Sequence, residues 1–208
     1  MNHMELCFIR HGQTDFNLRR IIQGSGVNSS LNETGRAQAR AFYDAYKSVS
    51  FDKVIASGLR RTHETVQPWT DAGLPLEIEP LINEMNWGVY EGKPGDEAMH
   101  KVYKAMIADW GGGNFDARLE GGESARELSE RLSAFLESLK NRTENRLLIC
   151  SHGRSLRCLV TLMKGQHLRE MENVSHANTG LFRATLTDGE FDVTLENDTS
   201  HLTAELIG

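Results

Sequence analysis

The sequence predicts a doubly wound α/β fold with a mostly parallel sheet and an antiparallel edge. Three apolar runs, at residues 6–9, 54–56 and 147–150, have the length and composition of strands that are buried on both faces, as in parallel sheets. A segment of helical periodicity follows each run, as the right-handed crossovers of such a sheet require. Residues 181–195 alternate in strand fashion around an Asp-Gly pair, which is typical of a hairpin and predicts the antiparallel edge.

Length and composition are those of one soluble globular domain, residues 1–208. The net charge of −6 argues against broad binding to nucleic acid or to an anionic membrane, so an anionic ligand would need a locally positive pocket. No apolar run approaches the roughly 18 residues of a membrane span. Residues 1–5 lack a signal-peptide layout, and we therefore expect a cytoplasmic protein.

The cysteines predict core packing rather than chemistry. Cys7 and Cys150 lie inside predicted strands, and neither they nor Cys158 belong to a Cys-x-x-Cys pair, which indicates small apolar residues in a reducing cytoplasm. A thiol-dependent phosphatase would need Cys-x5-Arg. Leu156 occupies that position after Cys150, and Arg157 misses it by one residue.

The first half of the chain continues as helix, strand and helix. Residues 17–22 predict a short helical turn, and Asn32 is a suitable N-cap for the clear helix that follows. A further helix, after the strand at residues 54–56, runs from about Leu59 to Pro68 or slightly past it. The apolar stripe of the helix after Asn32 consists of Leu31, Gly35, Ala39, Phe42 and Tyr46.

Residues 83–122 interrupt this alternation with many glycines, which are loop signals. Apolar residues at helical spacing within them predict a helix whose stripe is core rather than a ligand site. We expect residues 93–121 to form a small cap over the crevice at the end of the strands, because such insertions select substrates. The stripe consists of Met99, Val102, Tyr103, Met106, Ile107 and Trp110.

Two further helices complete the prediction. Ser124-x-x-Glu127 is a capping box that opens the first of them. The second covers residues 153–163. The apolar face of the first consists of Leu128, Leu132, Phe135 and Leu139.

Cations and histidines follow all three buried runs. Arg10 and His11 close the first, His152 closes the last, and Arg61 stands shortly after the middle one. Because the carboxyl ends of parallel strands meet at one edge, these groups converge where ligands bind in open α/β sheets. Arginine forks match phosphate oxygens, and a helix that begins at Gly153 would direct free N–H groups at the same point. The sequence therefore predicts an anion site, with phosphate as the first candidate.

No cofactor or metal is expected at this site. A phosphate-binding G-x-x-x-x-G-K-[ST] loop does not occur. Zinc is conceivable from the number of histidines, but H-E-x-x-H is missing and the arginines would repel a cation.

Histidine can instead act as a nucleophile, provided that one ring nitrogen is neutral and the other donates a hydrogen bond. The leaving group needs an acid, and Glu84 could enter the crevice. To carry a proton at neutral pH, it would need a pKa raised by burial. From spacing alone, Glu84 fits a solvated loop carboxylate better than a catalytic acid.

The motifs together resemble one family. Residues 10–17, Arg-His-Gly-Gln-Thr-Asp-Phe-Asn, resemble the R-H-G-x-T-x-x-N signature of the histidine phosphatase superfamily, the phosphoglycerate-mutase-like proteins. The resemblance implies a three-layer α/β/α sandwich and a phosphohistidine mechanism. It continues in order through Gln23-Gly24, Leu31-Asn32-Glu33-Thr34-Gly35, Ser57-x-Leu59-x-Arg61-x-x-x-Thr65, Glu84-x-x-x-Gly88-x-x-Glu91-Gly92, Gly122-Glu123-Ser124 and Ser151-His152-Gly153.

The resemblance also implies roles by position. His11 occupies a position that resembles that of the family's nucleophile. Glu84 resembles the acid that protonates the leaving alcohol and later activates water. Two positions depart from the family pattern: Gly58 stands where proline is frequent, and Thr62 where alanine is usual. The residues similar to the phosphate clamp are Arg10, Arg61 and His152, assisted by Asn17 and the Gly153 N–H, and those similar to substrate-side contacts are Gln23 and Gly24.

The length and arginine content of the cap segment indicate the branch of the family. Mutases carry a longer insertion with an arginine-rich segment, whereas residues 93–121 are short and lack an adjacent arginine pair. We therefore expect a phosphomonoester phosphatase that acts on a small phosphorylated metabolite, as a monomer or homodimer. A phosphoglycerate mutase and a non-catalytic phospho-ligand-binding member remain the alternatives. Histidines without a motif role, expected to be surface or core residues, are His3, His63, His100, His167, His176 and His201.

Overall fold

The computed structural model describes residues 3–207. Within them, six strands form one sheet in the order β3-β2-β4-β1-β5-β6. The three predicted buried strands are parallel neighbours, since β4 pairs with β1 on one side and with β2 on the other. The strands are β1 (His3–Arg10), β2 (Lys53–Ala56), β3 (Leu76–Ile78), β4 (Arg146–Ser151), β5 (Leu181–Thr187) and β6 (Glu190–Asp198).

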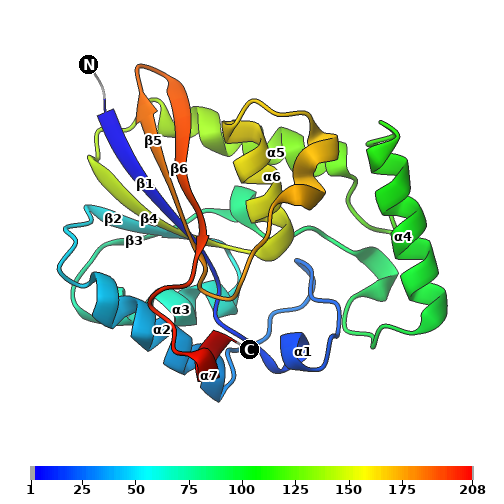
Figure 1. Cartoon of the computed structure of the whole chain (residues 1–208), viewed down its shortest axis with the longest axis horizontal. Helices are drawn as coiled ribbons and strands as arrows, with labels where there is room; N and C mark the ends of the chain where they lie inside the picture. Colours follow the sequence, from blue (N-terminus) through cyan, green and yellow to red (C-terminus); the bar gives the residue numbers. More distant parts are fainter. Residues whose placement is uncertain (1–2, 208) are drawn as a thin grey trace.

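Helices cover both faces of the sheet, and the predicted three-layer fold is confirmed (Figure 1). On one face lie α2 (Glu33–Tyr46), α3 (Arg60–Asp71) and α7 (Ala204–Ile207). The other face is covered by α5 (Ala125–Leu139) and α6 (Gly153–Met163), followed by the 3₁₀ segment η3 (Leu168–Asn173).

Alternate residues of β1 supply two separate cores. Leu6 and Phe8 pack with the helices α5 and α6, whereas Cys7 and Ile9 pack with residues of α2 and α3. All four side chains are buried, as expected for a strand covered on both faces. The antiparallel edge is also confirmed, because β5 pairs with β1 and β6 in antiparallel fashion.

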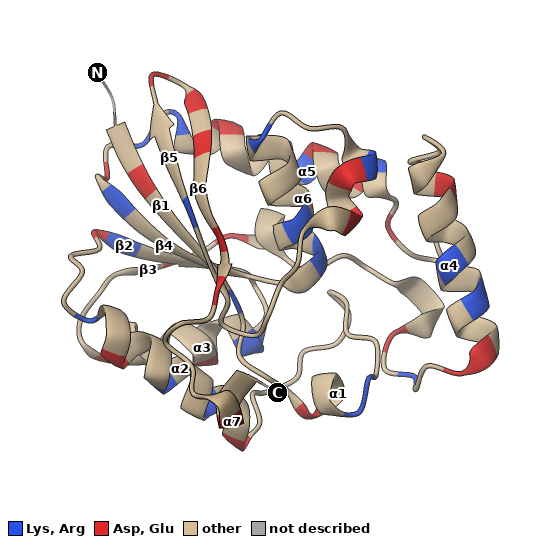
Figure 2. Cartoon of the chain, viewed as in Figure 1, with Lys and Arg blue, Asp and Glu red and all other residues tan. Residues whose placement is uncertain are grey.

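The cap segment contains α4 (Glu97–Gly111), which stands apart from the sheet (Figure 1). Its basic residues lie in the middle of the helix and its acidic residues towards the two ends (Figure 2). The buried face of α4 carries Met99, Met106 and Trp110, which agrees with the predicted stripe. Val102 departs from that prediction, because 44% of its surface is exposed.

Two local predictions need correction. The first helix, α1 (Asp15–Leu18), begins earlier than residues 17–22, because Thr14 caps it in a capping box. Arg20 then adopts a φ of 55°, which ends the helix. The edge strand β3 has no counterpart in the prediction, since its three residues are too short to carry a periodicity signal.

The remaining local signals are confirmed. The Asn32 side chain caps α2, and the Ser124 capping box opens α5. All three cysteines are buried and free. Nowhere in residues 3–207 does a helix combine the length and apolar character that a membrane crossing demands.

Candidate active site

The sheet register brings His11 and His152 together. Arg10 of β1 lies opposite Ser151 of β4, and each histidine is the next residue in its strand's chain. The His11 N–H continues the ladder by donating to the Ser151 carbonyl oxygen at 3.0 Å. The two buried imidazole rings consequently lie with centroids 5.2 Å apart, tilted by 56°.

His11 is held in one tautomer. Its Nδ1 lies 2.7 Å from the Gly12 carbonyl oxygen, which can only accept, so Nδ1 carries the proton. No residue in the described part of the chain bonds to Nε2, whose lone pair is therefore available. Burial, followed by the charges of Arg61 and Arg10, lowers the pKa of His11 well below its ordinary value. The ring is thus neutral at neutral pH, as a nucleophile requires.

Two arginines beside these rings have no carboxylate partner. Arg61 is fully buried and donates to the carbonyl oxygens of Val27 and Gly24 at 2.7 and 3.2 Å. Arg10 donates only a long 3.4 Å bond to the His176 carbonyl oxygen, and its Nε is buried without a partner. Within residues 3–207, neither forms an ion pair. Burial lowers the pKa of both to about 10, which still leaves them cationic at neutral pH.

His152 is oriented by groups on both of its nitrogens. Its Nδ1 accepts from Arg61 Nε at 3.2 Å, so Nε2 carries the proton and donates to Ser57 Oγ at 2.7 Å. Burial and the Arg61 charge lower the pKa of His152 well below its ordinary value. His152 is therefore neutral at neutral pH, and the positive charge of the site comes from Arg10 and Arg61.

Glu84 lies at the N-terminal end of α6. It follows the 3₁₀ turn η1 (Pro80–Ile82), and only 7% of its surface is exposed. Its Oε2 accepts from the Arg154 N–H at 3.1 Å, and its Oε1 accepts from the N–H groups of Met85 and Ser155 at 2.9 and 3.1 Å. The reading of Glu84 as a solvated loop carboxylate is thereby wrong.

The residues predicted to assist the phosphate clamp, Asn17 and Gly153, and those predicted as substrate-side contacts, Gln23 and Gly24, lie around these groups. Asn17 uses its side-chain oxygen in the capping box with Thr14. Gln23 donates to Thr14 Oγ1 at 2.6 Å, and Gly24 offers its carbonyl oxygen to Arg61. The Gly153 N–H opens α6 and has no acceptor among residues 3–207.

Two residues near the site were not predicted. His176 was expected to be a surface or core residue, yet it packs on Gly153, where an added Cβ would lie 2.9 Å from its Cε1. Burial and Arg10 lower its pKa to about 3. Arg154 bonds to Glu84 through its backbone N–H and to Tyr103 of α4 through its guanidinium. Neither belongs to a quoted motif, and no periodicity marks them.

Both departures from the family pattern make contacts at the site. The Gly58 N–H donates to Asn83 Oδ1 at 2.7 Å, a bond that a proline could not form. The Thr62 hydroxyl lies 3.0 Å from Ser57 Oγ and thereby helps to hold the acceptor of His152. Gly58 thus holds Asn83, the neighbour of Glu84, and Thr62 holds Ser57, the hydrogen-bond partner of His152.

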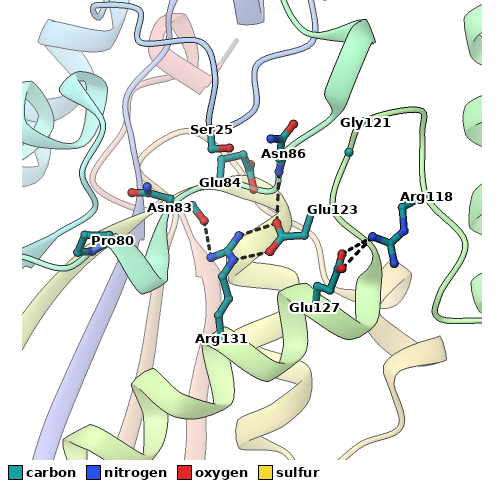
Figure 3. Close-up of a pocket in the computed structure, with 11 residues that line it drawn as sticks. Ser25, Pro80, Asn83, Glu84, Asn86, Arg118, Gly121, Glu123, Glu127 and Arg131 are labelled. Atoms are coloured by element: carbon teal, nitrogen blue, oxygen red, sulfur yellow. Dashed lines mark hydrogen bonds and ion pairs between the residues drawn. The ribbon is translucent and has the colours of Figure 1, made fainter.

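Glu84 also lines a polar cavity of about 420 Å³ (Figure 3). Neither His11 nor His152 lines it. Its charges are paired within the protein: Arg118 with Glu127, and Arg131 with Glu123. The part of the chain that is described holds no group of three or more His, Cys, Asp or Glu side chains arranged to bind a metal ion.

The chain is similar to proteins of one known superfamily. Residues 6–199 match the model of the histidine phosphatase superfamily (branch 1). The "Putative phosphoserine phosphatase 2" of Hydrogenobacter thermophilus is 30% identical over 177 residues, 85% of this chain and 86% of that protein. The "Probable phosphoglycerate mutase GpmB" of Enterobacter sp. is 30% identical over 97% of this chain and 96% of its own.

Among solved structures, the alpha-ribazole phosphatase of Shigella flexneri superposes with a TM-score of 0.83 at 27% identity, covering 94% of this chain and 96% of that one. YhfR of Bacillus stearothermophilus gives a TM-score of 0.84 at 26% identity, over 95% and 98% of the two chains. The similar proteins thus carry both phosphatase and mutase names.

Proposed function

The chain belongs to the histidine phosphatase superfamily, and we propose that it hydrolyses phosphomonoesters of small metabolites through a phosphohistidine at His11. One observation carries the proposal: a neutral imidazole with a free Nε2 lies beside two arginines that have no carboxylate partner, of which Arg61 is buried and Arg10 half-buried. Buried cations without counter-ions call for an anionic ligand. A tetrahedral phosphoryl group fits their donors.

In the first half-reaction, His11 Nε2 attacks the phosphorus and the bond to the ester oxygen breaks. Glu84, in its protonated form, gives its proton to that oxygen, so the product leaves as a neutral alcohol. Arg10, Arg61 and the Gly153 N–H stabilise the charge on the phosphoryl oxygens. His152 enters as a neutral group that its bonds to Arg61 and Ser57 hold in place.

In the second half-reaction, water attacks the phosphorus of the phosphohistidine. The Glu84 carboxylate takes a proton from that water, the N–P bond breaks, and inorganic phosphate leaves. In the structure both Glu84 oxygens accept backbone N–H bonds, which hold the carboxyl group in one orientation. The cycle restores the His11 lone pair and the protonated Glu84.

The cap supports hydrolysis over phosphoryl return. A mutase must hold the carboxylate of its substrate and keep water away from the phosphoenzyme. The one arginine of residues 93–121, Arg118, is engaged by Glu127 with bonds of 2.8 and 2.9 Å. The cap lysines Lys101 and Lys104 are exposed on α4.

The test is phosphate release from a panel of phosphomonoesters, with and without EDTA, for the wild type and His11→Ala. We expect turnover by the wild type alone, unchanged by EDTA. Interconversion of 3-phosphoglycerate and 2-phosphoglycerate faster than their hydrolysis would establish the mutase alternative. Binding of phosphorylated ligands without turnover would establish the non-catalytic one.

A further inference from the structure

A second cavity, of about 240 Å³, lies between the Gln23 segment and α4. Its walls are mainly aromatic and aliphatic. The rings of Trp87 and Tyr103 lie with centroids 5.8 Å apart, and Met99 is buried beside them on α4. We refer to it as the cap cavity; it is lined by Arg20, Ile22, Gln23, Trp87, Met99, His100 and Tyr103.

Two of the loops that line the cap cavity are tied to segments that carry active-site residues. Gln23 donates to Thr14 Oγ1, three residues after His11 in the sequence. Trp87 follows Glu84 by three residues, and its N–H donates to Glu91 Oε1 at 2.8 Å, which fixes the loop between them. Gln23 and Trp87 thus link the cap cavity to the segments that hold the proposed nucleophile and the proposed acid.

Arg154 joins the walls of the cap cavity to Glu84. Its backbone N–H donates to Glu84 Oε2, while its guanidinium lies 5.7 Å from the Trp87 ring and donates to the Tyr103 hydroxyl at 2.5 Å. Glu172 pairs with the same guanidinium, whose side chain is only 6% exposed. Arg154 therefore holds the rings in place without offering a free cation to a ligand.

The chemistry of the two cavities differs. In the polar cavity beside Glu84, both arginines are engaged by glutamates, so a charged ligand would have to compete with existing ion pairs. In the cap cavity an apolar group gains free energy by leaving water, and the one arginine that lines it, Arg20, is exposed to solvent rather than buried. Cavities of about 150 Å³ already accept a benzene molecule.

We propose that the cap cavity receives the alcohol part of the phosphomonoester and selects uncharged, apolar alcohols, such as alkyl chains or aromatic rings. This inference rests on the proposed function. It names the substrate class of the same site: a phosphate held by Arg10 and Arg61, with its organic part against Trp87 and Tyr103.

The direct test compares kcat/KM for ethyl phosphate and n-hexyl phosphate, whose primary alcohols are equally poor leaving groups. Each buried methylene favours binding about fourfold, so partial burial of four of them should give hexyl phosphate an advantage of about tenfold or more. Phosphoserine, as a charged alcohol, should be turned over less well than hexyl phosphate. An advantage near one, or a preference for phosphoserine, would overturn the inference.

Matched variants on the two sides of α4 locate the effect. Met99→Ala should reduce the hexyl-to-ethyl ratio at least threefold, because Met99 lines the cavity. Val102→Ala, on the exposed side of the same helix, should leave the ratio unchanged. Arg154→Met should also reduce the ratio, whereas Arg157→Met, which loses a bond to the same Glu172, should not. Equal ratios in all four variants would place the selectivity elsewhere.

Binding separates this inference from the proposed function. Calorimetric titration of His11→Ala with hexyl and ethyl phosphate measures the apolar preference without turnover. Tighter binding of hexyl phosphate supports the cap cavity even if the wild type hydrolyses neither ester, a result that would count against the proposed function alone. Equal affinities together with active hydrolysis would leave the phosphatase standing and overturn the cap cavity.

Discussion

The Ser57 hydroxyl oxygen lies 2.7 Å from Nε2 of the fully buried His152 and accepts the proton that the Arg61 bond to Nδ1 leaves there. The hydroxyl is held in turn by Thr62, at 3.0 Å. Because His152 Nδ1 faces Arg61, these contacts settle which edge of the ring meets each neighbour. The orientation of the His152 ring thus depends on Ser57 and Thr62 as well as on Arg61.

Ser57→Ala should weaken both folding and turnover. The substitution leaves the buried N–H of His152 without an acceptor, which costs about 1–3 kcal/mol of unfolding free energy. We expect kcat to fall by roughly an order of magnitude as the ring loses its orientation. Urea unfolding and steady-state kinetics measure the two effects. Thr62→Ala, which loosens the same hydroxyl, should cause a smaller loss, and a Ser57→Ala enzyme as active as the wild type would refute the role.

Glu84→Gln should separate leaving groups by their basicity. Glutamine cannot donate a proton to an alkoxide, so kcat for an alkyl phosphate should fall by about 10²–10⁴. With 4-nitrophenyl phosphate, the rate of the first half-reaction should fall less, because the phenolate leaves without protonation. Burst kinetics distinguish the two half-reactions. Equal losses for both esters in the first half-reaction would remove Glu84 from the acid role.

Stability should fall as the pH is lowered from 7 to 5.5. Burial lowers the pKa values of His11 and His152 well below 6.5, and that of His176 to about 3. Below pH 6.5 the unfolded chain therefore binds protons that the folded chain does not, and the unfolding free energy declines with falling pH. Each histidine contributes up to about 1.4 kcal/mol per pH unit.

Urea unfolding at pH 7 and pH 5.5 measures this decline above the range in which carboxylates titrate. His176→Gln removes one of the three groups and should give a shallower decline. A protein that is equally stable at both pH values, or more stable at pH 5.5, would contradict the neutral, buried state of these rings.

Much of the fold was predictable because strong local signals agree with the tertiary structure. The apolar runs of β1 and β4 end where the candidate catalytic residues begin, and the register of the sheet then brings His11 beside His152. Asn32 and Ser124 cap helices through hydrogen bonds that depend only on neighbouring residues. The short edge strand β3 was not predicted, because its three residues offer no such local support.

The state and surroundings of the site could not be read from the sequence in the same way. That His152 is neutral follows from its burial and from Arg61, which lies 91 residues away in the sequence. Arg154 reaches Tyr103 and Glu172 only after α4, α6 and η3 have packed. His176 likewise comes to Gly153 through the connection before β5.

Gly12→Ala should destabilise the protein and lower its activity. A Cβ at Gly12 would lie 2.5 Å from the Gly35 carbonyl oxygen, so the backbone beside His11 would have to move. We expect a loss of about 1–3 kcal/mol in unfolding free energy. Gly111→Ala meets no atom within 4 Å and serves as the control, expected to be neutral or slightly stabilising. Equal stabilities of the two variants would show that the loop adapts.

Rapid quenching of the enzyme with a ³²P-labelled phosphomonoester tests the central claim most directly. The account predicts an acid-labile, base-stable label on the protein, located at His11 by peptide mapping and missing from His11→Ala, with Arg61→Ala forming it more slowly. Turnover without any label on His11, or the same label in His11→Ala, would contradict a phosphohistidine at this position.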